Sequence, residues 1–325
     1  MKFVTFVQRG STQPRFGLLL ADGRIADLEG ACAARLAVDL PVRKACELAA
    51  VLAPSDALSF FDGGNLCLDA ARKTLAFIEA RGDTPKGPQG ETIVFAATAV
   101  ELKAPLLRPR KFIAAGKNFS DHTAEMGKAA GEGPRQPVAF AQVASTIVGP
   151  DAAIRHSSLT EKLDYEVEVA VVIGKRARNI DKKDAWDHVF GFTIFNDISA
   201  RDVYNNEGAN GIPLLGKNLA GFAPIGPCLV TKDEIAVPRD MHMQSRVNGQ
   251  VRQDSTPANM IFAFDEVIAH WSQIGLEPGD VLTSGTPKGV AAGRKPGQEP
   301  WWLKPGDVVE AEVAGIGILR NTIVA

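Results

Sequence analysis

The first hundred residues alternate short apolar runs with two longer segments of helical apolar spacing. The short runs are typical of strands, and Asp22-Gly23 predicts a tight turn between two of them. The segment 81–88 is rich in Gly and Pro and predicts an exposed connection. We therefore expect a small α/β unit over residues 1–104. Its predicted strands are 3–7, 16–20 and 24–28, and its predicted helices are 42–52 and 66–80.

Residues 105–325 are richer in strand-like runs. Two Pro-Gly-Asp turns, at 278–280 and 305–307, each lead into one. Strict strand–helix alternation, which a doubly wound parallel sheet requires, is rare. We predict an α+β fold that is mostly β, with mixed, curled sheets in this second unit. The predicted strands are 112–115, 166–173, 190–196, 228–231, 243–247, 281–284 and 308–313, and the predicted helices are 182–186 and 260–274.

A pair of glutamates, Glu166 and Glu168, opens the most apolar of these strands. Side chains alternate faces along a strand, so both carboxylates point the same way, with their Cα atoms roughly 6.6 Å apart. The uniformly apolar residues 169–173 that follow indicate sheet core. Two uncompensated like charges at the edge of a core are costly. A divalent cation is one remedy, and carboxylate oxygens suit Mg²⁺, Mn²⁺ or Ca²⁺.

Asp197 is the candidate third ligand, because it ends the predicted strand 190–196. Two glutamates and one aspartate leave about three positions of an octahedral Mg²⁺ to water or substrate. Open positions favour a catalytic ion over a structural one. The alternative is a solvated strand edge with both glutamates facing water, and spacing alone does not separate the two.

His122 is the candidate general base. Glu125 follows three residues later, so one helical turn brings the two side chains together. A carboxylate beside an imidazole raises its basicity and orients it, as for a base that acts on water. Glycines on both sides permit motion, as in a lid. The alternative is a structural histidine.

Two cations and a glycine-rich turn complete the candidate chemistry. Lys217 lies between apolar residues and is either a surface residue or a buried cation that faces an anionic ligand. Arg201 could orient a carboxylate in bidentate fashion, or simply pair with Asp202. The turn 284–290 lacks the pattern of a nucleotide-binding loop, but its hydroxyl and N–H groups could hold a carboxylate or enolate oxygen.

The composition excludes some classes of binding partner. The net charge is −2 and no basic block stands out, so neither nucleic acid nor an acidic membrane is expected. The four cysteines are scattered, without metal spacing. The amino terminus lacks the long apolar run of a signal peptide and no segment is long enough to span a membrane. We expect a cytoplasmic protein.

In chain order, these segments resemble the fumarylacetoacetate hydrolase family. The resemblance covers about residues 105–324 and rests on seven short motifs. They are the Gly-x-Asn-Phe-x-x-His run ending at His122, Asp-Tyr-Glu-x-Glu, Phe-Asn-Asp-Ile-Ser-Ala-Arg-Asp, Gly216-Lys217, Val247-Asn248-Gly249, Pro278-Gly279-Asp280 and Gly285-Thr286-Pro287. Residues 1–104 look like the amino-terminal domain that longer members carry. The resemblance implies packed, curled β-sheets of the sandwich or roll type, and usually a homodimer.

The resemblance also assigns roles. It implies that Glu166, Glu168 and Asp197 hold Mg²⁺, or Mn²⁺ or Ca²⁺, and that His122 and Glu125 form the base pair. It makes Lys217, Arg201 and Thr286 substrate-binding or oxyanion-stabilising. Several positions depart from the common pattern: Tyr204 replaces a frequent glutamine, Gln142 stands where lysine is frequent, and Lys288 lies inside the glycine turn. Tyr204 is expected at the pocket, and Lys288 either pairs with a second substrate carboxylate or is surface-exposed.

The activity implied first is metal-dependent hydrolysis of a C–C bond in acylpyruvate-like diketo acids, through a chelated enolate, in the breakdown of aromatic or other carbon compounds. A chelated enolate serves other reactions equally well. The second prediction is therefore an isomerase, tautomerase or decarboxylase of 2-oxo dicarboxylic acids, such as oxaloacetate or 2-hydroxymuconate-type compounds. A third alternative, a non-catalytic binding protein, has no need of the pair His122 and Glu125.

Overall fold

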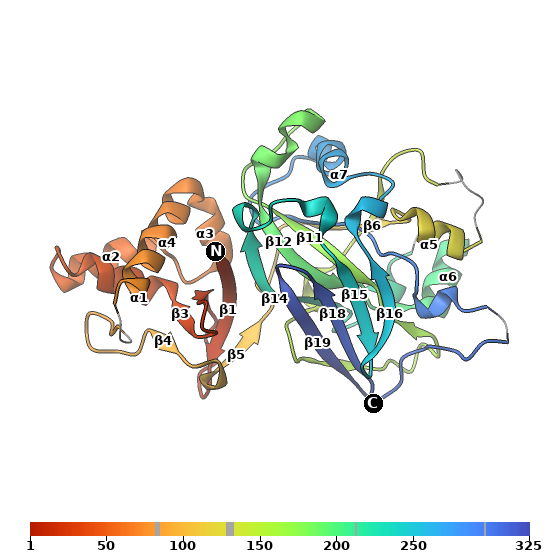
Figure 1. Ribbon diagram of the computed structural model, residues 1–325, viewed down its shortest axis with the longest axis horizontal. Coiled ribbons are helices and arrows are strands. Elements are labelled where there is room, and N and C mark those ends of the chain that lie inside the picture. The colour runs from red at the N-terminus through yellow and green to blue at the C-terminus, as the bar shows by residue number, and fades with distance from the viewer. Residues whose placement is uncertain (82–84, 128–132, 212, 296) are drawn as a thin grey trace.

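The computed structural model describes residues 1–81, 85–127, 133–211, 213–295 and 297–325. It has an amino-terminal unit with four helices beside a larger, strand-rich unit (Figure 1). Part of the predicted connection, residues 82–84, lies outside the described residues. The fold is α+β and mostly β, as predicted.

The helices of the amino-terminal unit pack on a short antiparallel meander. Two of the predicted helices are confirmed at Val42–Leu52 and Gly64–Glu79, whereas the sequence pattern did not indicate the other two. The strands are β1 (Lys2–Gln8), β2 (Arg15–Leu19), β3 (Ile25–Asp27), β4 (Val94–Phe95) and β5 (Val100–Lys103). The helices are α1 (Leu28–Leu36), α2 (Val42–Leu52), α3 (Ala57–Asp62) and α4 (Gly64–Glu79).

The second unit contains every predicted strand, and further strands beside them. The remaining strands are β6 (Phe112–Gly116), β7 (Val138–Ala141), β8 (Ile147–Val148), β9 (Ala153–Arg155), β10 (Leu163–Asp164), β11 (Val167–Ile173), β12 (Val189–Asn196), β13 (Ser199–Ala200), β14 (Ala223–Thr231), β15 (Met243–Val247), β16 (Gln250–Ser255), β17 (Val281–Thr283), β18 (Val308–Val313) and β19 (Gly317–Val324). The helices are α5 (Ser120–Glu125), α6 (Arg201–Ala209) and α7 (Phe264–Trp271).

Two predicted helices differ from the structure. The segment Lys182–His188 forms a 3₁₀-helix, and only Phe264–Trp271 of the predicted 260–274 is α-helical. Helix α7 begins after Ala263. The backbone N–H of Ala263 donates to the side chain of Glu266 at 2.9 Å, which satisfies a donor that has no partner within the helix. The helix ends in a 3₁₀ turn before Gly275, whose φ of 77° suits glycine.

One long mixed sheet runs through both units in the order β4-β3-β2-β1-β14-β12-β11-β17-β6-β7. Its two halves join where β1 pairs antiparallel with β14, with Phe3 opposite Leu229. A second sheet, in the order β16-β15-β18-β19-β9, is also open and lies beside β11, β12 and β14 (Figure 1). The pairing of β1 with β14 joins the two units through backbone hydrogen bonds. The boundary between residues 104 and 105 therefore stays a prediction.

Strand β11 lies inside the long sheet, between β12 and β17, and is buried throughout. Val167, Val169 and Val171 pack with residues of the second sheet, such as Val313. Ala170, on the opposite face, belongs to the core shared with the amino-terminal helices. This burial on both faces explains the continuous apolar run in the sequence.

No described helix combines the length and the apolarity that a membrane crossing requires. The cytoplasmic location and the homodimer stay predictions.

Candidate active site

The three predicted acidic ligands converge where strands β11 and β12 meet at one end. The strands are antiparallel, with Val167 opposite Asn196. The backbone N–H of Asp197 then donates to the carbonyl of Glu166 at 2.9 Å, which places these two residues side by side. One carboxylate oxygen from each of Glu166, Glu168 and Asp197 lies within 4.8 Å of the others. Sheet register therefore gathers three carboxylates from two segments of the chain.

The alternative of a solvated strand edge is wrong. Glu166, Glu168 and Asp197 are 4%, 1% and 1% exposed. Glu168 accepts a hydrogen bond from the backbone N–H of Gly285 at 3.2 Å. Among the described residues, Oδ1 of Asp197 is buried without a hydrogen-bond partner. A buried carboxylate oxygen that lacks a donor is costly, so this atom calls for a cation.

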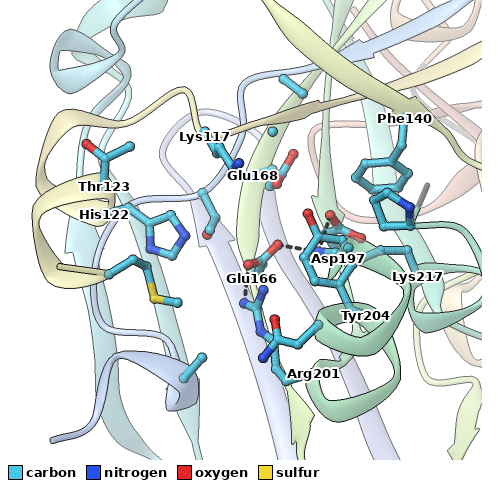
Figure 2. Close-up of a pocket in the computed structure, with 18 of the residues that line it drawn as sticks. Lys117, His122, Thr123, Phe140, Glu166, Glu168, Asp197, Arg201, Tyr204 and Lys217 are labelled. Atoms are coloured by element: carbon cyan, nitrogen blue, oxygen red, sulfur yellow. Dashed lines mark hydrogen bonds and ion pairs between the residues drawn. The ribbon is translucent and has the colours of Figure 1, made fainter. Parts of the chain in front are cut away.

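Lys217 is a buried cation, as one of its two interpretations predicted. Its Nζ lies 2.6 Å from Oε2 of Glu166 and 2.7 Å from Oδ2 of Asp197. The amino group also lies 5.5 Å from the ring centroid of Phe140 and 5.6 Å from that of Tyr204. Lys217 thus ties two of the three acidic residues together from one side of the site (Figure 2).

Arg201 is buried as well, and the alternative in which it simply pairs with Asp202 is wrong. Its Nε donates to Oδ2 of Asp164 at 2.8 Å, and its Nη2 pairs with Oε1 of Glu166. Asp202 instead accepts from the backbone N–H of Glu161 at 3.0 Å. The guanidinium therefore fixes Glu166 from the side opposite Lys217.

The cations divide the acidic groups into two kinds. Burial raises the pKa of Glu166, but Arg201 and Lys217 outweigh it and hold this pKa well below its usual range. Burial and the neighbouring charges of Asp197 and Glu166 raise the pKa of Glu168 well above its usual range. Burial also raises the pKa of Asp197 to about 7, against the opposing effect of Lys217. Lys217 pairs with Asp197, whereas Glu168 forms no ion pair with a described residue. Part of the negative charge of the three acidic residues therefore stays uncompensated without a further cation.

A divalent cation fits this arrangement. The site offers three hard oxygen donors, an unpartnered Asp197 Oδ1 and an uncompensated negative charge. These are the ligands and the charge that Mg²⁺, Mn²⁺ and Ca²⁺ prefer, and they do not distinguish among the three ions.

The triad lies at the floor of a cavity of about 580 Å³, a size typical of small-molecule sites. Strands β6 and β11, helices α5 and α6 and the turn after β17 all contribute to its wall. The wall residues include Lys117, His122, Arg201, Tyr204, Lys217 and Thr286 (Figure 2). The structure therefore brings nearly all predicted site residues to one cavity.

Helix α5 carries His122 across the cavity from the triad (Figure 2). Nδ1 of His122 lies 3.6 Å from Oε2 of Glu125, slightly beyond hydrogen-bond distance. Both oxygens of Glu125 accept from the backbone N–H of Gly289, at 3.1 and 3.0 Å. Glu125 thus anchors α5 to the turn after β17 as well as facing the histidine.

The glycine-rich turn contributes one predicted residue and not the other. Thr286 is buried on the cavity wall, where its hydroxyl donates to the carbonyl of Val167 at 3.0 Å and accepts from Gln253 at 2.7 Å. Lys288 is exposed and lies outside this wall, in agreement with the surface alternative. The chain turns away through Pro287 and Gly289, whose φ is 101°.

Three site residues were missed by the sequence reasoning as functional candidates. Asp164 receives Arg201 and the backbone N–H groups of Ala291 and Ala292, at 2.7 and 3.1 Å. Lys117 lies on the cavity wall beside β6, and the neighbouring Asn118 donates to the carbonyl of Ser284 at 2.9 Å. All three lie within motifs that the resemblance already used, but no periodicity or charge pattern distinguishes them.

Known proteins resemble this chain over most or all of its length. The family model described as the C-terminal region of fumarylacetoacetate (FAA) hydrolase matches residues 111–324. The mitochondrial oxaloacetate tautomerase fahd2 of Xenopus laevis is 36% identical over 327 residues, which cover 100% of this chain and 90% of the relative. Oxaloacetate tautomerase YisK of Bacillus subtilis is 38% identical over 262 residues, or 79% of this chain and 85% of the relative.

Solved structures show the same fold. The fumarylacetoacetate hydrolase of Exiguobacterium antarcticum superposes on this chain with a TM-score of 0.73 and is 33% identical to it. That alignment covers 100% of this chain and 99% of the other.

Proposed function

Because this chain belongs to the fumarylacetoacetate hydrolase family, we propose that it is a divalent-metal-dependent tautomerase of 2-oxo dicarboxylic acids such as oxaloacetate. The observation that carries the proposal is the buried triad of Glu166, Glu168 and Asp197 with its unpartnered Oδ1, at the floor of a cavity large enough for such an acid. The oxaloacetate tautomerases of Xenopus laevis and Bacillus subtilis, which are similar to this chain, support the reaction type. They favour the tautomerase prediction over the hydrolase prediction.

Tautomerisation moves one proton between the enol oxygen on C2 and the carbon C3, and the substrate keeps its mass. Its difficult species is the enolate, whose negative charge lies largely on the C2 oxygen. A divalent ion held by the triad would supply Lewis-acid stabilisation of that charge. The ammonium of Lys217, buried between Glu166 and Asp197, adds fixed positive charge in the same place.

The proton needs a carrier, and His122 is the candidate. Its Nδ1 faces Glu125, so we assign the Nδ1 proton to that side and leave Nε2 to exchange a proton with C3. A positioned base or acid of this kind typically contributes about 10²- to 10⁴-fold. Arg201 keeps Glu166 ionised and oriented, and so acts on the floor of the cavity through that residue.

C–C hydrolysis of an acylpyruvate-like diketo acid is the second candidate. The pairing of His122 with Glu125 favours it, because hydrolysis requires a base that deprotonates water. The resemblance to the Exiguobacterium antarcticum hydrolase supports it as well. The same enolate charge would then develop on the leaving fragment.

Product analysis tests the two candidates and a decarboxylase together. The purified protein is given the enol form of oxaloacetate and, separately, an acylpyruvate, each with and without Mg²⁺ or Mn²⁺. We expect metal-dependent loss of the enol absorbance with oxaloacetate recovered intact in its keto form. If only the acylpyruvate reacts, and it yields two acids, the tautomerase proposal is overturned in favour of the hydrolase. Release of CO₂ from oxaloacetate as the main product would indicate a decarboxylase.

A further inference from the structure

Lys117 has a backbone conformation that lysine rarely adopts. Its φ is 54°, in the left-handed region. Among the described residues, the other non-glycine positions with positive φ are Asp151, Asn179 and Asn248. Asp and Asn tolerate this region far better than lysine, whose Cβ crowds the following carbonyl. Backbone strain of this kind persists where the surroundings enforce it, and it concentrates at functional sites.

The next residue, Asn118, enforces the conformation. Its buried side-chain amide donates to the carbonyls of Phe262 and Ser284, at 3.1 and 2.9 Å, and accepts from the N–H of Phe262 at 2.9 Å. Its carbonyl accepts from Ile261 at 2.7 Å. On the other side, β6 ends at Gly116, which pairs with Val138. The backbone of Lys117 is held between a paired strand and a fully hydrogen-bonded asparagine. These contacts set the direction in which the lysine side chain leaves the backbone.

That direction is into the cavity. Lys117 lies on the cavity wall, and its ammonium points toward the space above Glu168 (Figure 2). Two other cations of the wall, Arg201 and Lys217, already form ion pairs with acidic residues of the floor. The ammonium of Lys117 forms no ion pair or hydrogen bond with any described residue. It is therefore the lysine of this wall that is free to meet an anion brought by the substrate.

We propose that Lys117 binds the distal carboxylate of the substrate and so selects dicarboxylic over monocarboxylic 2-oxo acids. This inference rests on the proposed function for the position of the 2-oxo acid end, which the triad floor would hold. A four-carbon acid held at that end must place its second carboxylate away from Glu166, Glu168 and Asp197, because like charges repel. Lys117 supplies an unshared positive charge on the cavity wall. Lys288, the other lysine considered for this carboxylate, is exposed and outside the wall.

A binding experiment tests the assignment without requiring turnover. Malate and 2-hydroxybutanoate share a 2-hydroxy acid end and differ in the distal carboxylate. Their dissociation constants are measured by calorimetry with Mg²⁺ present, for the wild type, Lys117→Met, Lys117→Gly, Lys117→Arg and Lys288→Met. We expect the wild type to prefer malate. The two neutral variants at position 117 should bind malate about 10- to 100-fold more weakly, the range for a lost charge-assisted hydrogen bond. Binding of 2-hydroxybutanoate should change less than about twofold.

The control variants make the result decisive. Lys117→Arg keeps the charge and should retain the preference for malate, whereas Lys117→Gly accepts the positive φ and guards against a folding defect in Lys117→Met. A preference that survives both neutral variants, or that disappears in Lys288→Met instead, overturns the assignment. So does equal weakening of both ligands, or a wild type with no preference. A wild type that prefers malate but does not tautomerise oxaloacetate overturns the proposed function and leaves this assignment standing.

Discussion

The floor and the rim of the cavity are built in different ways. The floor consists of Glu166, Glu168 and Asp197, which lie where β11 begins and β12 ends and are almost completely buried. The rim consists of Lys117, on an exposed turn, and helix α5 with His122 and Glu125, which are 13% and 20% exposed at their side chains. Floor residues are fixed by sheet pairing and buried ion pairs. Rim residues are fixed by a few hydrogen bonds to neighbouring turns.

This difference separates two tasks. Charge is stabilised most effectively where water is excluded and dipoles cannot relax, which is the condition of the floor. A group that must meet substrate from outside needs access, which is the condition of the rim. If the proposed function holds, changes at the floor should remove the chemistry together with the binding of a divalent ion. Changes at the rim should alter proton transfer or substrate choice and leave ion binding intact.

Replacing Glu168 with Gln tests the floor and should have the largest effect. The side chain keeps its size but loses a ligand charge, so we expect kcat/KM to fall roughly 10³-fold, as for lost electrostatic stabilisation in a buried site. Addition of Mg²⁺ should raise the thermal midpoint of the wild type, because a ligand that binds only the folded state stabilises it. That shift should be absent in Glu168→Gln. Turnover and melting are measured across a Mg²⁺ titration after treatment with a chelator.

The matched substitution at the rim is Glu125→Gln. The amide oxygen can still accept from the N–H of Gly289, which Glu125 contacts with both oxygens. We expect a loss of activity of about tenfold, since one charged hydrogen bond is replaced by a neutral one, and a normal Mg²⁺ shift. Near-normal turnover of Glu168→Gln with the metal removed would contradict the role of the floor. A larger loss in Glu125→Gln than in Glu168→Gln would do the same.

Replacing His122 with Gln tests whether the rim residue carries the proton independently of ion binding at the floor. Gln occupies similar space but cannot carry a proton at neutral pH, so kcat should fall roughly 10²-fold. The thermal shift with Mg²⁺ should match the wild type. Exchange of the C3 protons of oxaloacetate with deuterated water, followed by NMR, should slow by the same factor. Loss of the Mg²⁺ shift in this variant would show that rim and floor act as one unit.

The elements of the floor could be predicted from the sequence because both faces of their strands are apolar. Strands β11 and β12, which carry the floor, follow the predicted bounds closely. Outside the floor, strands β15 and β18 and helix α2 do so as well. Strand β19 was not predicted, since the buried Asn321 interrupts the apolar alternation of Leu319 and Ile323. The side-chain amide of Asn321 donates to the backbone carbonyls of Gly149 and Ala152, at 3.0 and 2.9 Å. No local sequence pattern reveals these long-range contacts.

The candidate site was predictable in its residue types and less so in its contacts. Two glutamates at strand spacing indicated a shared face, and the triad converges as expected. The partners of Arg201 were missed, because Asp164 and Glu166 lie 37 and 35 residues away and only the sheet brings them together. The conformation of Lys117 depends on Phe262 and Ser284, which no reading of the segment 116–118 alone would connect to it.

The backbone of the rim should be strained at Lys117, whose φ is 54°, whereas the floor has no such residue. Replacing Lys117 with Gly tests this through the free energy of unfolding, and its expected effect is the smallest. Glycine accepts a φ of 54° without crowding but loses more conformational entropy on folding, so the free energy of unfolding should rise by about 0.5–1 kcal/mol. Urea denaturation measures it as a higher midpoint at unchanged slope. Asn179→Gly, at a φ of 51° on an exposed residue, is the control and should gain less, because asparagine already tolerates this region. A more stable Lys117→Gly that binds malate poorly would mean that the lysine is kept at a stability cost for its function. A Lys117→Gly variant no more stable than Asn179→Gly would show that the turn around position 117 carries no strain specific to lysine.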